Sequence, residues 1–445
     1  MIPIDHPFGA RTMSRLRHLL GFALCSLALA EGGAPQPIDK GEAAMCFREA
    51  QALSNRDGGK LWGKPLYGPM LFVAVASRSI TTNQLDAKGA LHPAGEVCEG
   101  SLPKDVMVAN MAMEWSGTHW IMVMWGAVSE NRHSRAKLMM HESFHRIQKS
   151  LGHGSQGGPC DHLDSKDGRI WLQLEWRALG EALVARGSAR QRAIQDALLF
   201  RAYRRSLFPE AAETERDLEL HEGLAEYTGI RVSARSEAQA IADALGNLVS
   251  YAQVPTFVRS FAYASGPAYG LLLDASAPAW RNRIKEQPDL GDLLRKALAI
   301  KVIPSGKTQA FAYAEGYGLR ELVEDETRRD EARKAKVAQF RARLVDGPVL
   351  ILPRSQTLNY SFDPLEVLPF GDLGTVYPNL KASDPWGTLE ASEGALMTPT
   401  DLRLPAPENL QAKPLKGVGW SLDLAPGWKL VPDVRKGDYR LVKGE

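Results

Sequence analysis

The segment KLMMHESFHRIQ, residues 137–148, constrains this chain most, because it places two histidines four residues apart around a glutamate in a helical, largely apolar run. Positions i and i+4 of an α-helix project from the same face, so His141 and His145 can offer two imidazole nitrogens to one ion. Glu142 is rotated to the side of that face and does not compete as a ligand. The segment therefore predicts half of a metal site, with a carboxylate beside it.

This arrangement suits zinc chemistry. A zinc ion lowers the pKa of a water molecule, and a neighbouring carboxylate can take the proton as the water attacks a carbonyl carbon. We therefore expect one Zn²⁺ bound by His141 and His145, with Glu142 as the general base. A hydrolase of this type needs a third protein ligand.

The best candidate for that ligand lies in ELHEGLAEYTG, residues 219–229. Glu222 and Glu226 are again four residues apart on one helix face, which is costly to bury unless a cation or hydrogen-bond donors are present. Glu222 can complete a His-His-Glu site, while Glu226 can accept the free ring N–H of a ligand histidine and fix its tautomer. Glu175 and Glu181 remain rival third ligands.

These segments resemble the gluzincin metallopeptidases, especially the aminopeptidase N-like enzymes. In that family an Asn-Glu-Gly-Phe-Ala segment supplies the third ligand, and HEGLA, residues 221–225, stands in its place. The family also has a tyrosine in a Tyr-x-x-Gly segment, which Tyr263 and Gly266 match in YASGPAYGLLLD. The resemblance implies a zincin-like core, hydrolysis of peptide bonds in peptide or protein substrates, and Tyr263 as a donor to the oxyanion.

The chain also departs from that family. Between His145 and Glu222 there are 76 residues, a much longer interval than in those enzymes, so an inserted helical segment must fill it. The Gly-x-Met-Glu-Asn motif of the aminopeptidases is matched only in part at residues 112–115, which lack both the glycine and the asparagine. Before the motif, GTHWIMVMWGAVSE (117–130) alternates enough to predict an edge strand, to which zincins add an extended peptide. The tryptophans of this region are interpreted as core residues.

The pattern of apolar and turn residues along the chain predicts an α+β fold with a further β-rich domain, and the resemblance implies that the first part is a zincin-like metallopeptidase core. Residues 31–135 mix one helix with strand-like runs and form the N-terminal α/β part of the core. Residues 136–345 are mostly helical and carry the metal site. Residues 346–445 contain short apolar runs separated by turn residues, which indicates a small β-rich C-terminal domain.

The N-terminal residues indicate export. From Met13 the chain reads MSRLRHLLGFALCSLALAEGG, in which basic residues precede an apolar run and a small-x-small pattern. We interpret residues 1–30 as a secretory signal peptide cleaved after Ala30, which predicts a periplasmic or secreted protein. No later run approaches about 18 apolar residues, so no integral membrane segment is expected after cleavage. Cleavage leaves an odd set of three cysteines, and at most one internal disulfide can form among them: Cys46, Cys98 and Cys160.

The charge composition bears on which kinds of molecule the protein can bind. The 445 residues include 54 Lys and Arg against 52 Asp and Glu, a net charge of +2, which does not favour nucleic acid as a partner. The sequence specifies no oligomeric state. Two alternatives to a metallopeptidase stay open: a non-catalytic, zincin-fold binding protein of the cell envelope, and a zinc hydrolase of a non-peptide amide. Glu142 favours hydrolysis, because a binding protein does not need a carboxylate beside the ion.

Overall fold

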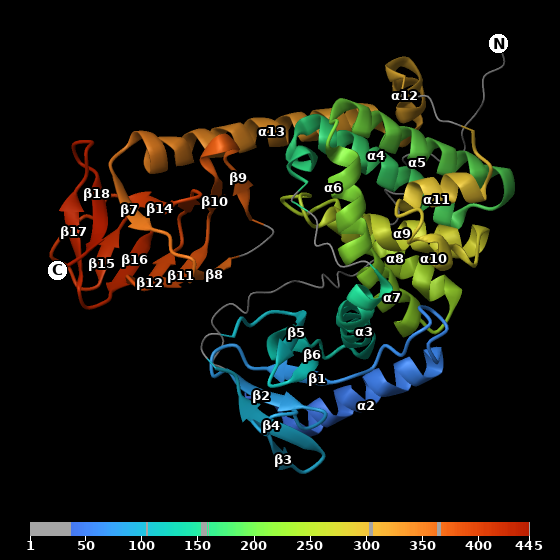
Figure 1. Ribbon diagram of the computed structural model, residues 1–445. Helices are drawn as coiled ribbons and strands as arrows, with labels where there is room; N and C mark the ends of the chain where they lie inside the picture. Colours follow the sequence, from blue (N-terminus) through green and yellow to red (C-terminus); the bar gives the residue numbers. More distant parts are fainter. Residues whose placement is uncertain are drawn as a thin grey trace. The chain divides into compact units, whose positions relative to one another are not determined.

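The computed structural model describes residues 37–103, 106–152, 158, 160–301, 306–362 and 366–444. The chain is a mixed α+β protein that divides into two compact units, Met1–Leu322 and Val323–Glu445 (Figure 1). The division falls within helix α13 (Leu319–Arg341). The α+β class predicted from the sequence is thus confirmed.

A mixed six-stranded sheet lies in the first unit, in the order β3-β4-β2-β1-β6-β5. Its strands are β1 (Met70–Val73), β2 (Ser79–Thr82), β3 (His92–Ala94), β4 (Val97–Ser101), β5 (Met111–Trp115) and β6 (Thr118–Met124). β1 runs parallel to β6, and the other neighbours are antiparallel. All four residues of β1 are buried, and their side chains point alternately to the two faces of the sheet. Leu71 joins an apolar cluster around Trp120, whereas Phe72 stacks on Phe47 of α2 (Lys40–Asp57).

The strand before the motif helix is not at the edge of this sheet, so that prediction is wrong. β6 lies between β1 and β5, and β5 is the edge strand. A two-residue turn joins β5 to β6, with positive φ at Ser116 (49°) and Gly117 (75°). Two successive positive φ angles are characteristic of the type I′ turn, which matches the twist of a hairpin. The turn adds β5 outside β6, which explains why the middle of β6 is buried.

The rest of the first unit is helical. Its helices are α3 (Arg132–Gln148), α4 (Lys166–Val184), α5 (Gly187–Leu207), α6 (Ala211–Leu218), α7 (Leu224–Ser233), α8 (Glu237–Tyr251), α9 (Phe261–Ser276), α10 (Trp280–Arg283), α11 (Leu290–Ala297) and α12 (Lys307–Ala314). A π-helical turn, η4 (Glu219–Gly223), joins α6 to α7. Short 3-10 segments are η1 (Trp125–Ala127), η2 (Lys149–Leu151), η3 (Asp161–Asp164) and η5 (Glu315–Tyr317). Helix α3 contacts β6 and α7, so it connects the sheet with the helices (Figure 1).

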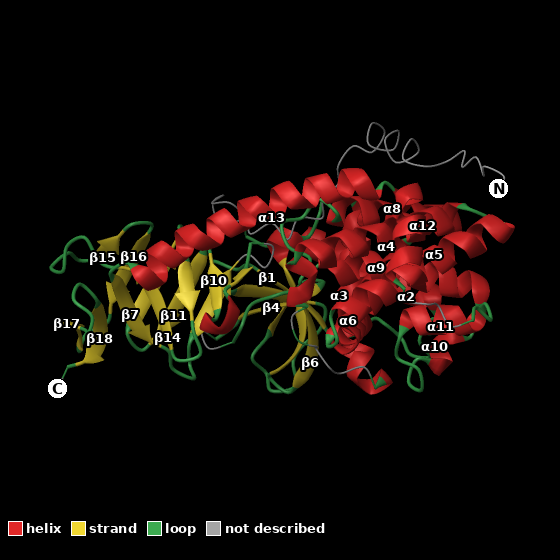
Figure 2. Ribbon diagram, turned by 90° about the horizontal axis from the view of Figure 1, so that it is seen from above, coloured by secondary structure: helices red, strands yellow, loops and turns green. Residues whose placement is uncertain are grey.

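The second unit is β-rich, and Figure 2 shows its strands in yellow. One sheet has the order β17-β18-β7-β14-β13-β10-β9 and the other β15-β16-β12-β11-β8. The strands are β7 (Val349–Pro353), β8 (Asn359–Phe362), β9 (Leu368–Pro369), β10 (Thr375–Tyr377), β11 (Leu380–Asp384), β12 (Gly387–Ala391), β13 (Ala395–Met397), β14 (Asp401–Pro405), β15 (Leu415–Gly417), β16 (Trp420–Leu424), β17 (Trp428–Pro432) and β18 (Tyr439–Lys443). Leu352 and Leu402 from one sheet and Leu389 and Leu422 from the other share one buried apolar cluster.

A buried ionic network holds the helices between α3 and α7 together. Arg204 on α5 contacts Glu175 on α4 and, through Nε at 2.8 Å, Oε1 of Glu215 on α6. Arg201, one helical turn earlier, contacts Glu175 at 3.2 Å and Glu219 of η4 at 2.8 Å. All five side chains are at most 4 % exposed. Buried charges of this kind must be paired, so the network specifies how α4 and α5 pack against η4.

Several sequence-based expectations concern export. The predicted signal peptide and its cleavage site lie outside the described residues. Among the helices that are described, none is both long and apolar enough to cross a bilayer.

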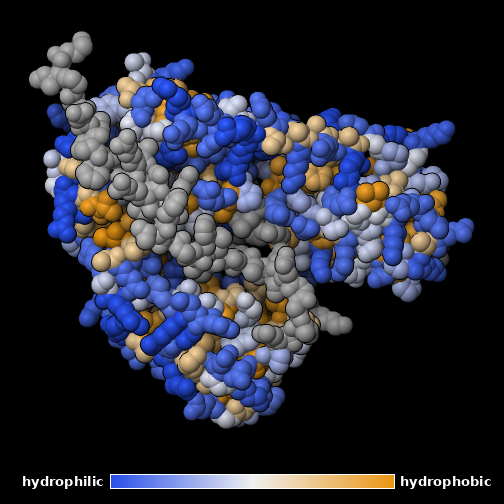
Figure 3. All heavy atoms as spheres, turned by 180° about the vertical axis from the view of Figure 1, so that it is seen from behind, coloured by the Kyte–Doolittle hydropathy of each residue, from blue (hydrophilic) through white to orange (hydrophobic). Residues whose placement is uncertain are grey.

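Cys46, Cys98 and Cys160 are all free thiols. On the face shown in Figure 3, hydrophobic side chains are scattered among hydrophilic ones.

The ionic network predicts an acid-sensitive fold. Burial alone would raise the pKa of Glu215, but Arg204 and His162 hold it well below its usual range. Since the folded-state pKa is the lower one, this carboxylate stabilises the fold above its unfolded pKa, and the contribution is lost as the pH falls toward the folded value. Below about pH 4.3 we expect Glu215 to contribute a loss of about 1.4 kcal/mol per pH unit.

Urea unfolding at several pH values between about 6 and 3 measures this dependence. Glu215→Gln should flatten the slope, whereas Glu213→Gln, at a side chain that is 74 % exposed on the same helix, should not. Equal slopes in Glu215→Gln and the wild type would contradict the prediction.

Candidate metal centre

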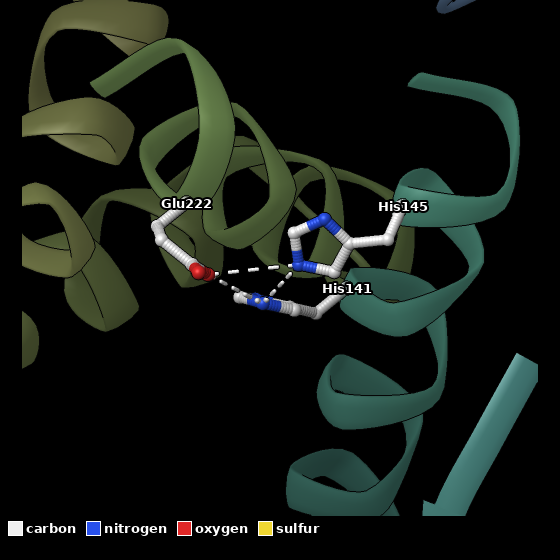
Figure 4. A group of neighbouring side chains, drawn as sticks. All are labelled: His141, His145 and Glu222. Carbon is white, nitrogen blue, oxygen red and sulfur yellow. Dashed lines mark hydrogen bonds and ion pairs between the residues drawn. The ribbon is translucent and has the colours of Figure 1, made fainter. Parts of the chain in front are cut away.

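Helix α3 carries both motif histidines on its buried side. Asn131 caps the start of the helix, and its side chain accepts hydrogen bonds from the backbone N–H groups of His133 and Ser134. Its i and i+4 positions bring the rings of His141 and His145 to 5.0 Å between centroids. The Nε2 atoms of the two rings lie 3.2 Å apart (Figure 4).

The other ring nitrogen of each histidine is already bonded. Nδ1 of His141 lies 2.9 Å from Oε2 of Glu226, and Nδ1 of His145 lies 2.9 Å from Oε1 of Gln148. The amide nitrogen of Gln148 donates to two backbone carbonyls of η4, so its oxygen is the acceptor. Each Nδ1 must therefore carry the proton, which leaves both Nε2 lone pairs facing each other. Only a proton or a metal cation between them removes this repulsion.

Glu222 supplies the third donor from the π-helical turn. Its Oε2 lies 3.5 Å from Nε2 of His141 and 3.6 Å from Nε2 of His145. With the 3.2 Å between the nitrogens, these separations define a point about 2.0 Å from all three atoms, which is the length of zinc bonds to imidazole and carboxylate. Two imidazoles and one carboxylate are also a donor set typical of catalytic zinc. The three residues therefore fit a single zinc ion.

Two glycines allow the elements of this centre to approach each other. A Cβ atom on Gly266 of α9 would lie 2.3 Å from Cα of Gly223 in η4, and one on Gly223 would lie 3.0 Å from Cα of Gly266. Backbone thus meets backbone where α9 crosses η4. Since Glu222 precedes one glycine and Tyr263 lies one helical turn before the other, the crossing brings these two side chains together.

Tyr263 lies directly against the cluster. Its hydroxyl donates to Oε2 of Glu222 at 2.7 Å, and its ring stacks on His141 with centroids 5.6 Å apart and planes 5° apart. Burial raises the pKa of Tyr263 well above its usual value, and Glu222 adds to the effect, so the hydroxyl keeps its proton. The residue predicted as an oxyanion donor is a hydrogen-bond donor at the cluster, and its partner in this structure is Glu222.

Glu142 is a buried carboxylate with an unused oxygen. The residue is 5 % exposed, and Oε2 has no hydrogen-bond partner. Burial raises the pKa of Glu142, while His141 and His145 oppose the rise. A buried carboxylate oxygen without a partner is costly and rare, and is typical of a site at which a further molecule binds.

Opposite charges balance within the cluster. Burial alone would lower the pKa of His141, but hydrogen bonds with Glu222 and Glu226 raise it to about 10. Burial would raise the pKa of Glu222, yet His141 and His145 hold it well below its usual range. The carboxylates of the cluster therefore favour a positive charge, a proton or a metal ion, at the two histidines.

The rival third ligands lie elsewhere. Glu175 is paired with Arg201 and Arg204 in the buried network and accepts a hydrogen bond from Tyr269 at 2.7 Å. Glu181 belongs to a different group, near Asp196, where burial and that second carboxylate raise its pKa to about 7. Among the described residues, the group of side chains arranged for one ion is His141, His145 and Glu222.

Sequence reasoning missed several supporting residues. Lys137 lies 3.0 Å from Oε1 of Glu226, to which the amide of Asn247 also donates at 2.9 Å. Gln148 could have been found, because it is one helical turn after His145. Arg146, unusual directly after such a motif, donates to three successive backbone carbonyls, those of Pro65, Leu66 and Tyr67.

Substitution of Gly266 tests the crossing of α9 with η4. In Gly266→Ala the added Cβ meets backbone that cannot move independently, so we expect a loss of about 1–3 kcal/mol in the free energy of unfolding and weaker zinc binding. The matched control is Gly246→Ala in α8, where a Cβ meets nothing within 4 Å and should add up to about 1 kcal/mol of helix stability. Unfolding titrations and chelator competition measure the two effects, and unchanged zinc affinity in Gly266→Ala would contradict the expectation.

Comparison of the chain with protein-family models, curated proteins and solved structures finds no match. The site is therefore described by its residues and their geometry: a partly buried His-His-Glu cluster that could bind a metal ion, with Glu142 and Tyr263 at its border.

Proposed function

We propose that this protein is an exported zinc-dependent metallopeptidase, built on a zincin-like core, that hydrolyses peptide bonds in peptide or protein substrates. His141, His145 and Glu222 would hold the ion. The observation that carries the proposal is the pair of Nε2 atoms 3.2 Å apart, each on a ring whose Nδ1 is already bonded to an oxygen. This arrangement prepares both nitrogens to coordinate one cation.

Zinc held there would supply the Lewis acidity that activates a water molecule and polarises the carbonyl of the substrate. Glu142 is the general base: its unpartnered Oε2 takes the proton of the attacking water and passes it to the leaving amine. This role gives a buried, unsatisfied carboxylate a partner during the reaction. A protein that only binds metal would gain nothing from it, so Glu142 favours hydrolysis over a purely binding role.

Tyr263 would stabilise the charge that develops on the carbonyl oxygen. Its hydroxyl retains its proton because its pKa is raised, and a neutral donor aimed at a developing negative charge lowers the barrier to reaction. To do this the hydroxyl must exchange Glu222 Oε2, now 2.7 Å away, for the substrate oxygen. By bonding Nδ1 of His141, Glu226 would leave Nε2 free to hold the ion.

The edge strand β5 supports an extended polypeptide as substrate. Its outer side has no partner strand within the described sheet. An extended peptide can pair with such an edge through backbone hydrogen bonds, which recognise the main chain rather than particular side chains. A small non-peptide amide has no use for this surface, so β5 favours a peptide substrate.

Glu142→Gln tests the mechanism. The amide keeps the shape of the side chain but cannot take a proton, so we expect hydrolysis of a casein or peptide-library substrate to fall by about 10²- to 10⁴-fold. Zinc content, measured by mass spectrometry, should stay at the wild-type level. Glu213→Gln serves as a control at an exposed position. Wild-type turnover in Glu142→Gln would contradict the mechanism.

Glu222→Ala tests the ligand set. Removal of one of three protein ligands should abolish stoichiometric zinc binding, while the wild type binds one ion per chain. Native mass spectrometry of both proteins after zinc is supplied gives the comparison. Equal zinc content in the two would show that Glu222 is not a ligand.

A further inference from the structure

The helix that supplies Glu222 changes its register in the turn that contains that residue. α6 and α7 form one continuous helical run, and η4 is a π-helical turn inside it. In an uninterrupted α-helix, Glu219, Glu222 and Glu226 would share one face, because they are spaced i, i+3 and i+7. A π-turn contains one extra residue, so it rotates the side chains before it by about 100° relative to those after it.

The observed contacts follow this rotation. Glu222 and Glu226 point to α3, where they contact His141. Glu219 instead points to α5, where both of its oxygens accept hydrogen bonds from the guanidinium of Arg201, one at 2.8 Å. Glu219 is 1 % exposed and Arg201 3 % exposed. A buried, bidentate pair of this kind fixes both distance and orientation.

The alternative register would be unfavourable. If the run were α-helical throughout, Glu219 would turn toward Glu222 and away from Arg201. Two buried carboxylates would then repel each other, and Arg201 would lose the carboxylate that binds both of its Nη atoms. The ion pair therefore favours the π-helical register, in which Glu222 and Glu226 alone face the histidines.

We propose that Arg201 and Glu219 are positioning residues for the metal centre: their ion pair holds the π-helical turn and so sets the position of Glu222. This inference rests on the proposed role of Glu222 as a zinc ligand. It also assigns a purpose to the long segment between the two ligand motifs, because that segment contains α5, the helix from which Arg201 reaches the turn.

A second contact supports this assignment from the opposite side. Gln148 of α3 donates to the backbone carbonyls of Leu220 and His221, at 3.0 and 3.1 Å, and accepts from Nδ1 of His145. The turn is therefore held from two sides. Arg201 of α5 binds a side chain of the turn, and Gln148 of α3 binds two of the turn's backbone carbonyls. One residue, Gln148, links the backbone of the turn to a histidine of the cluster.

The test compares two isosteric substitutions in the same buried network. Glu219→Gln weakens the pair that holds the turn, whereas Glu215→Gln weakens an equally buried pair on α6, outside the turn. The readouts are the zinc dissociation constant, from chelator competition, and the visible absorption spectrum of the Co²⁺-substituted protein, which reports coordination geometry. Circular dichroism establishes that each variant is folded.

We expect Glu219→Gln to weaken zinc binding by about 10- to 100-fold and to change the Co²⁺ spectrum, as loss of a residue that orients a ligand does. Glu215→Gln should change neither. Arg201→Lys keeps the positive charge but loses the bidentate contact, so it should resemble Glu219→Gln and replaces it if that variant does not fold.

Two results would overturn the inference: wild-type affinity and spectrum in Glu219→Gln or Arg201→Lys, or an equal loss in Glu215→Gln, which would indicate a general effect of stability. Failure of the wild type to bind zinc would instead overturn the proposed function, so the two failures are distinguishable.

Discussion

The contact between two imidazole nitrogens 3.2 Å apart governs the rest of the site. Each ring has its Nδ1 bonded to an oxygen that can only accept, so neither Nε2 can relieve the contact by changing tautomer. A proton or a metal cation between them relieves the contact, and the acids around the cluster provide the negative charge that either one requires. The same contact explains the roles of Glu226 and Gln148, which fix the tautomers of the two histidines without contributing a donor to the cluster.

The course of the backbone brings the three donors together. Because Gly223 and Gly266 have no side chains, the backbones of α9 and η4 can come into direct contact where they cross. The π-helical turn directs Glu222 to one side and Glu219 to the other. Neither feature adds a group to the cluster. Both determine whether Glu222 lies within reach of His141, which is why the residues that position this site extend to α5.

The sequence was sufficient to predict which side chains lie together in the cluster, but not the contacts that position them. Spacing of four residues is a local property of a helix, so His141 with His145 and Glu222 with Glu226 could be found by inspection. A π-turn depends on contacts with another helix, and nothing in ELHEG distinguishes it from an α-helix. By sequence alone Glu175 remained a rival candidate for the third ligand, and only the structure shows that Arg201 and Arg204 pair with it. The edge position of β6 was predicted wrongly because alternation does not reveal whether a hairpin partner lies outside a strand.

The glutamates of one helical run show how electrostatics selects the ligand among several acids. Four of them follow one another at intervals of four, three and four residues: Glu215, Glu219, Glu222 and Glu226. Arginines of α5 pair with the first two, and Lys137 pairs with the last. Among the described residues, the charged partners of Glu222 within 4.0 Å are histidines, which are neutral when they bind metal. Of these four glutamates, Glu222 is thus the one without a permanent cation of the protein among the described residues, and a bound metal ion would supply the missing charge.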